Sequence, residues 1–129
     1  MTANLSTSGR ILAVVTDLML ESRITEGARA LGYAVTTAGS TRDVREALGS
    51  NSVDLIVLDL QADGVPWKDV VSAASEAANG PLPVLAFGQH TKPDLLQAAR
   101  DGGCDVAVPR SRLVEQFPAL IEQALGKTS

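Results

Sequence analysis

The sequence is poor in aromatic residues and contains a single cysteine. Aromatics make up 3% of the 129 residues, so a core has to be built from Val, Leu, Ile and Ala, which suits a parallel sheet covered by helices. Because Cys104 is the only cysteine, an internal disulfide and a cysteine-based metal cluster are both excluded. We interpret Cys104 as a small core residue, since no histidine or asparagine partner of a catalytic thiol lies beside it.

Clustered positive charge and long apolar runs are also missing. The net charge is -4, which argues against a surface that binds nucleic acid. No apolar run approaches the roughly 20 residues that a membrane helix needs. The first nine residues are polar and lack the apolar centre of a signal peptide. We therefore expect a cytoplasmic protein that binds neither nucleic acid nor membrane.

What is present is a regular alternation of strand and helix patterns. The run Ile11–Val15 is continuously apolar, as expected for a strand buried on both faces. Leu20, Ile24 and Ala28 then recur at helical spacing, and Gly32 occupies the position of a helix C-cap. The patterns predict strands at 11–15, 34–38, 54–60, 83–87 and 105–108, and helices at 18–31, from 40, 66–80, 93–103 and from 118, with a helical turn at 111–116.

The alternation predicts an α/β domain of the (βα)5 type over residues 10–126. Residues 1–9 are expected to form a flexible leader and residues 127–129 a short tail. Right-handed crossovers between parallel strands place helices on both faces of one sheet, which gives three layers. In such sheets ligands bind beyond the carboxyl ends of the strands. This edge contains the candidate residues Thr16, Asp17, Asp59, His90, Arg110 and Ser111.

Several of these residues have a plain structural alternative. Asp17 is also a good N-cap for the helix that follows it. His90 is the only histidine and is equally expected as a solvated loop residue. Arg110 could bind a phosphate or carboxylate in bidentate fashion, or form a salt bridge with Asp59 or Asp17. Arg23 is expected on the surface.

Four segments resemble the receiver domain of bacterial response regulators: DLIVLDL at 54–60, ALGY at 30–33, LPVL at 82–85 and AARDGGCD at 98–105. The resemblance extends over residues 10–126. It implies a flavodoxin-like fold with a five-stranded parallel sheet of order 2-1-3-4-5. It also implies a bacterial protein of two-component signalling or a phosphorelay, with a kinase or an output protein as partner.

The resemblance further implies a phospho-acceptor carboxylate and a Mg²⁺ site. The sequence has the acceptor but lacks part of the Mg²⁺ site. Asp59 matches the acceptor at the end of the third strand. The acidic pair that holds Mg²⁺ falls on Val15 and Thr16, and Asp17 comes one residue later. Mg²⁺ prefers several oxygen ligands, so a site formed by Asp17 and Asp59 alone is expected to be weak.

Two further positions differ from the receiver pattern. Gly88 stands where the pattern has a hydroxyl side chain, and Arg110 stands in place of a lysine, followed by Ser111 instead of proline. Arginine keeps the charge but replaces a compact ammonium by a planar fork. The sequence therefore predicts a pseudo-receiver, without standard Mg²⁺-dependent aspartyl phosphorylation.

Three functions remain open from the sequence. The first is a stand-alone, non-enzymatic module, monomeric or weakly dimeric, that signals through protein contacts, for which the face formed by the fourth helix, fifth strand and fifth helix is a candidate. The second is a true phospho-receiver that accepts phosphate on Asp59 from a histidine kinase. The third is a small-anion or nucleotide-binding module that uses His90, Arg110 and Ser111.

Overall fold

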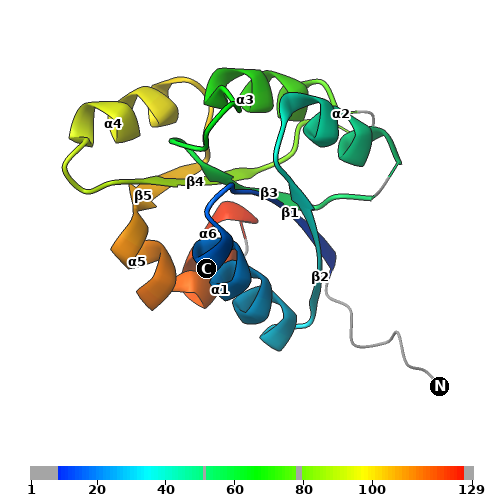
Figure 1. The fold of residues 1–129 in the computed structure, drawn as a ribbon, viewed down its shortest axis with the longest axis horizontal. Coiled ribbons are helices and arrows are strands. Elements are labelled where there is room, and N and C mark those ends of the chain that lie inside the picture. Colours follow the sequence, from blue (N-terminus) through cyan, green and yellow to red (C-terminus); the bar gives the residue numbers. More distant parts are fainter. Residues whose placement is uncertain (1–8, 51, 78–79, 127–129) are drawn as a thin grey trace.

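The computed structural model describes residues 9–50, 52–77 and 80–126. Residues 1–8 of the predicted leader and the predicted 127–129 tail lie outside the described residues, as do Asn51 and Asn79. The strands form one parallel sheet of order β2-β1-β3-β4-β5, which confirms the predicted topology (Figure 1). The strands are β1 (Gly9–Val14), β2 (Tyr33–Ala38), β3 (Leu55–Asp59), β4 (Val84–Gly88) and β5 (Val106–Pro109).

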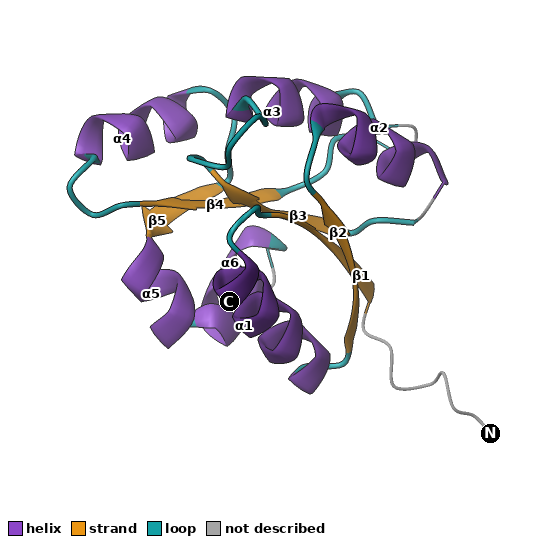
Figure 2. Ribbon diagram, in the orientation of Figure 1, coloured by secondary structure: helices purple, strands orange, loops and turns teal. Residues whose placement is uncertain are grey.

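Helices cover both faces of the sheet (Figure 2). One face packs against α2 (Thr41–Ser50), α3 (Trp67–Ser75) and α4 (Pro93–Asp101), and the other against α1 (Leu18–Ala30), α5 (Arg110–Glu115) and α6 (Phe117–Ala124). Successive residues of each strand point to opposite faces, so Leu12 and Val14 join the first core layer while Ile11 and Ala13 join the second. Burial on both sides explains why the strand sequences are continuously apolar.

Local signals place most helix ends where the sequence predicts them. Gly32 follows α1 with a φ of +91°, a conformation that glycine adopts without steric cost. The exception is α3, which begins after Pro66 and ends at Ser75, before the predicted end at residues 79–80. The Ala74 carbonyl accepts the backbone N–H of Leu82 at 3.0 Å and that of Ala77 at 3.4 Å, so its shorter hydrogen bond goes to the segment that enters β4. This early end of α3 is the main difference from the predicted elements.

Parallel strands bring all their carboxyl ends to one edge of the sheet. The residues that end or follow the strands there, among them Thr16, Asp59, Gly88 and Arg110, therefore come from four different strand–helix connections. Within the described part of the chain, no helix has the length and apolar character needed to cross a bilayer.

Candidate functional site

Asp59 ends β3 in the middle of the sheet, next to Phe87 of β4. Its side chain is only 3% exposed, and it is the only buried polar or charged side chain among the described residues. Its Oδ1 accepts a hydrogen bond from the Gln61 backbone N–H at 2.9 Å. An ionisable group buried at the carboxyl edge of a parallel sheet marks the centre of the candidate site.

Burial, a hydrogen bond and two neighbouring charges shift the pKa of the Asp59 carboxyl in opposite directions. Burial raises the pKa of the Asp59 carboxyl above its ordinary value of 3.8, since the charged form loses hydration. The hydrogen bond from Gln61 and the positive charge of Arg110 lower this pKa, and the negative charge of Asp17 raises it. In the described residues no ion pair joins Arg110 to Asp59 or to Asp17, so the alternative of a salt bridge is not formed.

Asp17 is the N-cap of α1, as predicted. It has an extended backbone conformation, and its Oδ1 accepts hydrogen bonds from the Met19 and Leu20 backbone N–H groups at 3.0 and 3.1 Å. The side chain is exposed, unlike that of Asp59. The structure therefore gives Asp17 a local structural role at the start of the helix.

Two further hydrogen bonds tie the loops of this edge together. Thr16 Oγ1 accepts the Asp63 backbone N–H at 3.2 Å, which joins the loop after β1 to the loop after β3. Gln61 Oε1 accepts the Gln89 backbone N–H at 2.9 Å, which joins the loop after β3 to the loop after β4. The sequence places Gln61 at the predicted ligand-binding edge, two positions after Asp59, but assigns it no role.

The end of β4 carries no hydroxyl group. Gly88 pairs with Pro109, and a Cβ built on Gly88 would lie 3.5 Å from Gln61 Oε1. The Gln61 side chain thus passes close to the place where the receiver pattern has a serine or threonine side chain. Gly88 is buried, so the position is a packed strand end and not an open cavity.

An open pocket of about 660 Å³ lies beside this edge, between α1, the loop after β4, and α5. It brings together three of the predicted residues, His90, Arg110 and Ser111, whereas Thr16, Asp17 and Asp59 do not line it. Arg23 of α1 also lines the pocket, a role that its predicted surface position did not indicate. The other lining residues are Gln89, Thr91, Val114 and Glu115.

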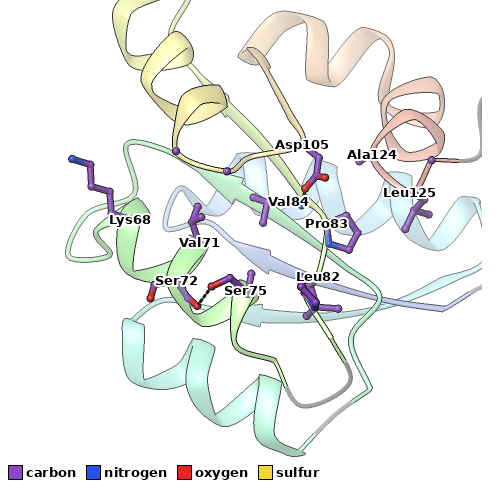
Figure 3. Close-up of a pocket in the computed structure, with 15 residues that line it drawn as sticks. Lys68, Val71, Ser72, Ser75, Leu82, Pro83, Val84, Asp105, Ala124 and Leu125 are labelled. Atoms are coloured by element: carbon purple, nitrogen blue, oxygen red, sulfur yellow. Dashed lines mark hydrogen bonds between the residues drawn. The ribbon is translucent and has the colours of Figure 1, made fainter.

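A second pocket lies at the opposite edge of the sheet, where β4 and β5 begin (Figure 3). Its walls include the apolar side chains of Val71, Leu82 and Pro83. Asp105 lines it as well, but its Oδ1 accepts the Val84 backbone N–H at 2.9 Å and so helps to hold two strands together. Asp105 therefore serves the fold in this pocket.

Cys104 is buried, as predicted for a small core residue. Burial, and to a lesser extent the neighbouring Asp105 carboxylate, raise the pKa of the thiol from 9.0 to about 11. The thiolate is the reactive form of cysteine, so this residue does not have the properties of a nucleophile.

No family model matches the chain. Among solved structures it is similar to a response regulator receiver domain protein from Clostridium thermocellum, with a TM-score of 0.78 and 17% identity over 92% of this chain and 95% of that chain. Full-length FixJ from B. japonicum matches with a TM-score of 0.81 and 20% identity, over 94% of this chain and 59% of FixJ. A Burkholderia pseudomallei response regulator with a phosphorylated aspartic acid, calcium ion and citrate matches with a TM-score of 0.77 and 15% identity, over 93% of this chain and 70% of that chain.

These similarities define the fold. The chain has the flavodoxin-like architecture of response-regulator receiver domains, as the resemblance of its segments implies. At these identities the shared architecture says nothing about individual site residues, which have to be judged from the geometry of this chain.

Proposed function

We propose that the protein is a receiver-like signal-transduction module that acts through contact with another protein, without standard Mg²⁺-dependent phosphorylation of Asp59. The receiver fold supports the signalling role. The observation that carries the second part is the position of Asp17, which is exposed and caps α1 through Oδ1, whereas Asp59 is buried and its Oδ1 accepts the Gln61 backbone N–H.

The residues present do not fit a Mg²⁺ site. Mg²⁺ demands near-octahedral oxygen coordination and is usually held by one or two carboxylates. Here the Asp59 carboxyl is buried and its pKa is raised. The Asp17 carboxylate is exposed and accepts hydrogen bonds from two backbone N–H groups. In the described residues no group of three or more His, Cys, Asp or Glu side chains gathers where a metal ion could bind.

The two other positions that departed from the receiver pattern support the same proposal. Gly88 offers no hydroxyl to a phosphoryl group on Asp59. Arg110 has the charge of the expected lysine, but it forms no ion pair with Asp59 in the described residues.

The start of α1 supports a role in protein contact. Leu18 is 78% exposed and Met19 is 80% exposed, and they are the most exposed large apolar residues in the described part of the chain. Apolar area is favourably removed from water when two proteins associate, and methionine adapts well to different partners. We propose the segment 17–19 as the contact surface in preference to the face of α4, β5 and α5, where only Val114, at 37%, is exposed among large apolar residues.

The proposal includes the absence of enzymatic activity. It follows the prediction from the sequence, in which no nucleophile–base pair stands out. The cytoplasmic location and the monomeric or weakly dimeric state stay predictions from the sequence.

Phosphorylation is tested by incubating the protein with Mg²⁺ and acetyl phosphate and measuring its intact mass, with Asp59→Asn as control. We expect no phosphoryl adduct on either protein. An adduct on the wild type that is absent from Asp59→Asn would instead establish the phospho-receiver, with phosphate transferred from a histidine kinase as the next step to seek.

The contact surface is tested by placing a photo-crosslinking amino acid at position 19 in cells that produce the protein. We expect a discrete crosslinked product from position 19 and none from position 122, an exposed residue on α6 that serves as the matched control. Equal crosslinking from both positions would contradict a specific contact at the start of α1.

A further inference from the structure

We propose that the pocket between α1, the loop after β4, and α5 binds a small organic anion, with its carboxylate or phosphate group held by Arg110 and Arg23. The proposal goes beyond the signalling role and does not depend on it. It rests on the charge of the pocket, on one unpartnered buried nitrogen, and on the size and composition of the pocket walls.

The charge of the pocket is opposite to that of the protein. Its titratable lining residues are Arg23, Arg110, His90 and Glu115, so two permanent positive charges face one carboxylate. The whole chain carries a net charge of -4. In the described residues neither arginine forms an ion pair; the one ion pair there joins Arg42 to Glu46 on the surface of α2. Two guanidinium groups without a carboxylate partner in an acidic protein favour a bound anion.

Arg110 contributes the most specific observation. Its Nε is buried and has no hydrogen-bond partner. A buried donor without an acceptor costs about 1–3 kcal/mol, and more when the group is charged. Asp59 attracts Arg110 electrostatically, but its Oδ1 accepts the Gln61 backbone N–H and no hydrogen bond joins it to Arg110 in the described residues. No acceptor within the protein therefore holds the Arg110 guanidinium at Nε, and Arg110 lines the pocket.

The chemistry of the guanidinium group defines what that acceptor should be. A carboxylate or a phosphate places two oxygens at the spacing of two guanidinium N–H groups and accepts two parallel hydrogen bonds. Such a pair with the guanidinium group of Arg110 would neutralise part of the positive charge of the pocket.

The other walls indicate an organic molecule and not a bare inorganic ion. A volume of about 660 Å³ lies within the range of sites for small organic ligands. Ser111 and Thr91 provide hydroxyl groups, and Val114, which is 37% exposed, provides apolar surface. A ligand with an anionic group and an apolar body matches both kinds of wall.

The experiment titrates ¹⁵N-labelled protein with phenyl phosphate, with benzoate, with inorganic phosphate and with benzyl alcohol as the uncharged control, and follows the backbone amides and the arginine Nε–H signals. We expect phenyl phosphate or benzoate to shift the Arg110 Nε–H signal and the amides of Gln89 to Thr91 in a saturable way. Phenyl phosphate and benzoate distinguish the phosphate class from the carboxylate class. Inorganic phosphate should bind more weakly, and benzyl alcohol should leave Arg110 Nε–H unchanged.

Two variants separate a built site from general attraction of anions. Arg110→Met should weaken binding about tenfold or more, as loss of charge-assisted hydrogen bonds predicts. Arg112→Met is the matched control, because Arg112 lies on the same helix and is exposed, but its Nε donates to Gln116 Oε1 at 3.0 Å and it does not line the pocket. The proposal is overturned if both variants weaken binding equally, or if neither organic anion shifts Arg110 Nε–H. Circular dichroism checks that both variants are folded.

Discussion

Gln61 connects the loop after β3 to the loop after β4, because its Oε1 accepts the Gln89 backbone N–H at 2.9 Å. This bond joins two parts of the molecule that the sequence separates by 28 residues. On one side, the Gln61 backbone N–H donates to Oδ1 of the buried Asp59 carboxylate. On the other side, Gln89 lines the pocket. A single residue thus contacts both candidate sites, through its backbone on one side and its side chain on the other.

We predict that Gln61→Ala loosens the loop after β4 without unfolding the domain. Loss of one hydrogen bond of this kind costs about 0.5–1.5 kcal/mol, and the Gln89 amide should exchange with solvent faster. Gln61→Glu is the matched variant, since it keeps an oxygen acceptor at the same reach. Hydrogen exchange followed by NMR measures the effect, and unchanged protection of Gln89 in Gln61→Ala would show that the bond does not hold the loop.

The second prediction concerns the cap at Asp17. Asp17→Ala should lower the free energy of unfolding by about 1 kcal/mol, because the N–H groups of Met19 and Leu20 lose their acceptor. Asp17→Asn should lower it much less, since asparagine is also a good N-cap. Urea unfolding provides the measurement.

Repeating the urea series with Mg²⁺ distinguishes a cap from a metal ligand. If Asp17 serves as a cap, Mg²⁺ leaves the midpoints of the wild type and of Asp17→Asn equally unaffected. A Mg²⁺-dependent rise in the wild type that is lost in Asp17→Asn would assign Asp17 to a metal site and contradict the proposed function.

The fold was predictable from sequence because its signals are local. The continuous apolar run at 55–58 and the helical spacing of Leu20, Ile24 and Ala28 each follow from which faces of an element are buried. The cap at Asp17 was predictable for the same reason, since it involves residues only two and three positions away. The end of α3 was not predictable in this way, because the Ala74 carbonyl accepts the backbone N–H of Leu82, in the segment before β4.

The candidate site was only partly predictable, because it depends on how separate elements pack. Topology alone places Asp59 and Arg110 at one edge of the sheet, and the structure adds that Arg110 forms no ion pair with it in the described residues. Arg23 lines the pocket with Arg110 because α1 and α5 cover the same face of the sheet. The bond from Gln61 to Gln89 depends on a side-chain conformation that no periodic pattern encodes.

The third prediction follows from the raised pKa of Asp59. Because the pKa in the folded state lies above the ordinary value of 3.8, the folded protein binds this proton more tightly than the unfolded chain does. The contribution of Asp59 to stability is therefore greatest below pH 3.8 and falls as the pH rises through 3.8 toward the folded-state pKa. The Asp59→Asn variant cannot ionise at this position, so its stability does not decrease with pH for this reason.

Chemical unfolding of the wild type and Asp59→Asn over a pH series measures the effect. The stability of Asp59→Asn relative to the wild type should increase with pH across this window, by at most about 1.4 kcal/mol per pH unit, and then stay constant. A relative stability that decreases with rising pH would mean that the hydrogen bond from Gln61 and the attraction of Arg110 together outweigh burial, so that the pKa of Asp59 is lowered in the folded protein.

The fourth prediction compares two glycines at opposite edges of the sheet. A Cβ at Gly88 would lie 3.5 Å from Gln61 Oε1 and 3.7 Å from Leu60 Cδ1 and Leu96 Cδ2, which are ordinary van der Waals distances. Gly88→Ala should raise the free energy of unfolding by about 0.4–1 kcal/mol, since alanine has less backbone freedom to lose on folding. Gly103→Ala should lower it by more than that, because Gly103 has a φ of +117° and its Cβ would lie 3.2 Å from Val71 Cγ1. The urea midpoints of both variants provide the measurement. If Gly88→Ala proves as destabilising as Gly103→Ala, the end of β4 has no room for a side chain. Packing against Gln61 would then require glycine at position 88.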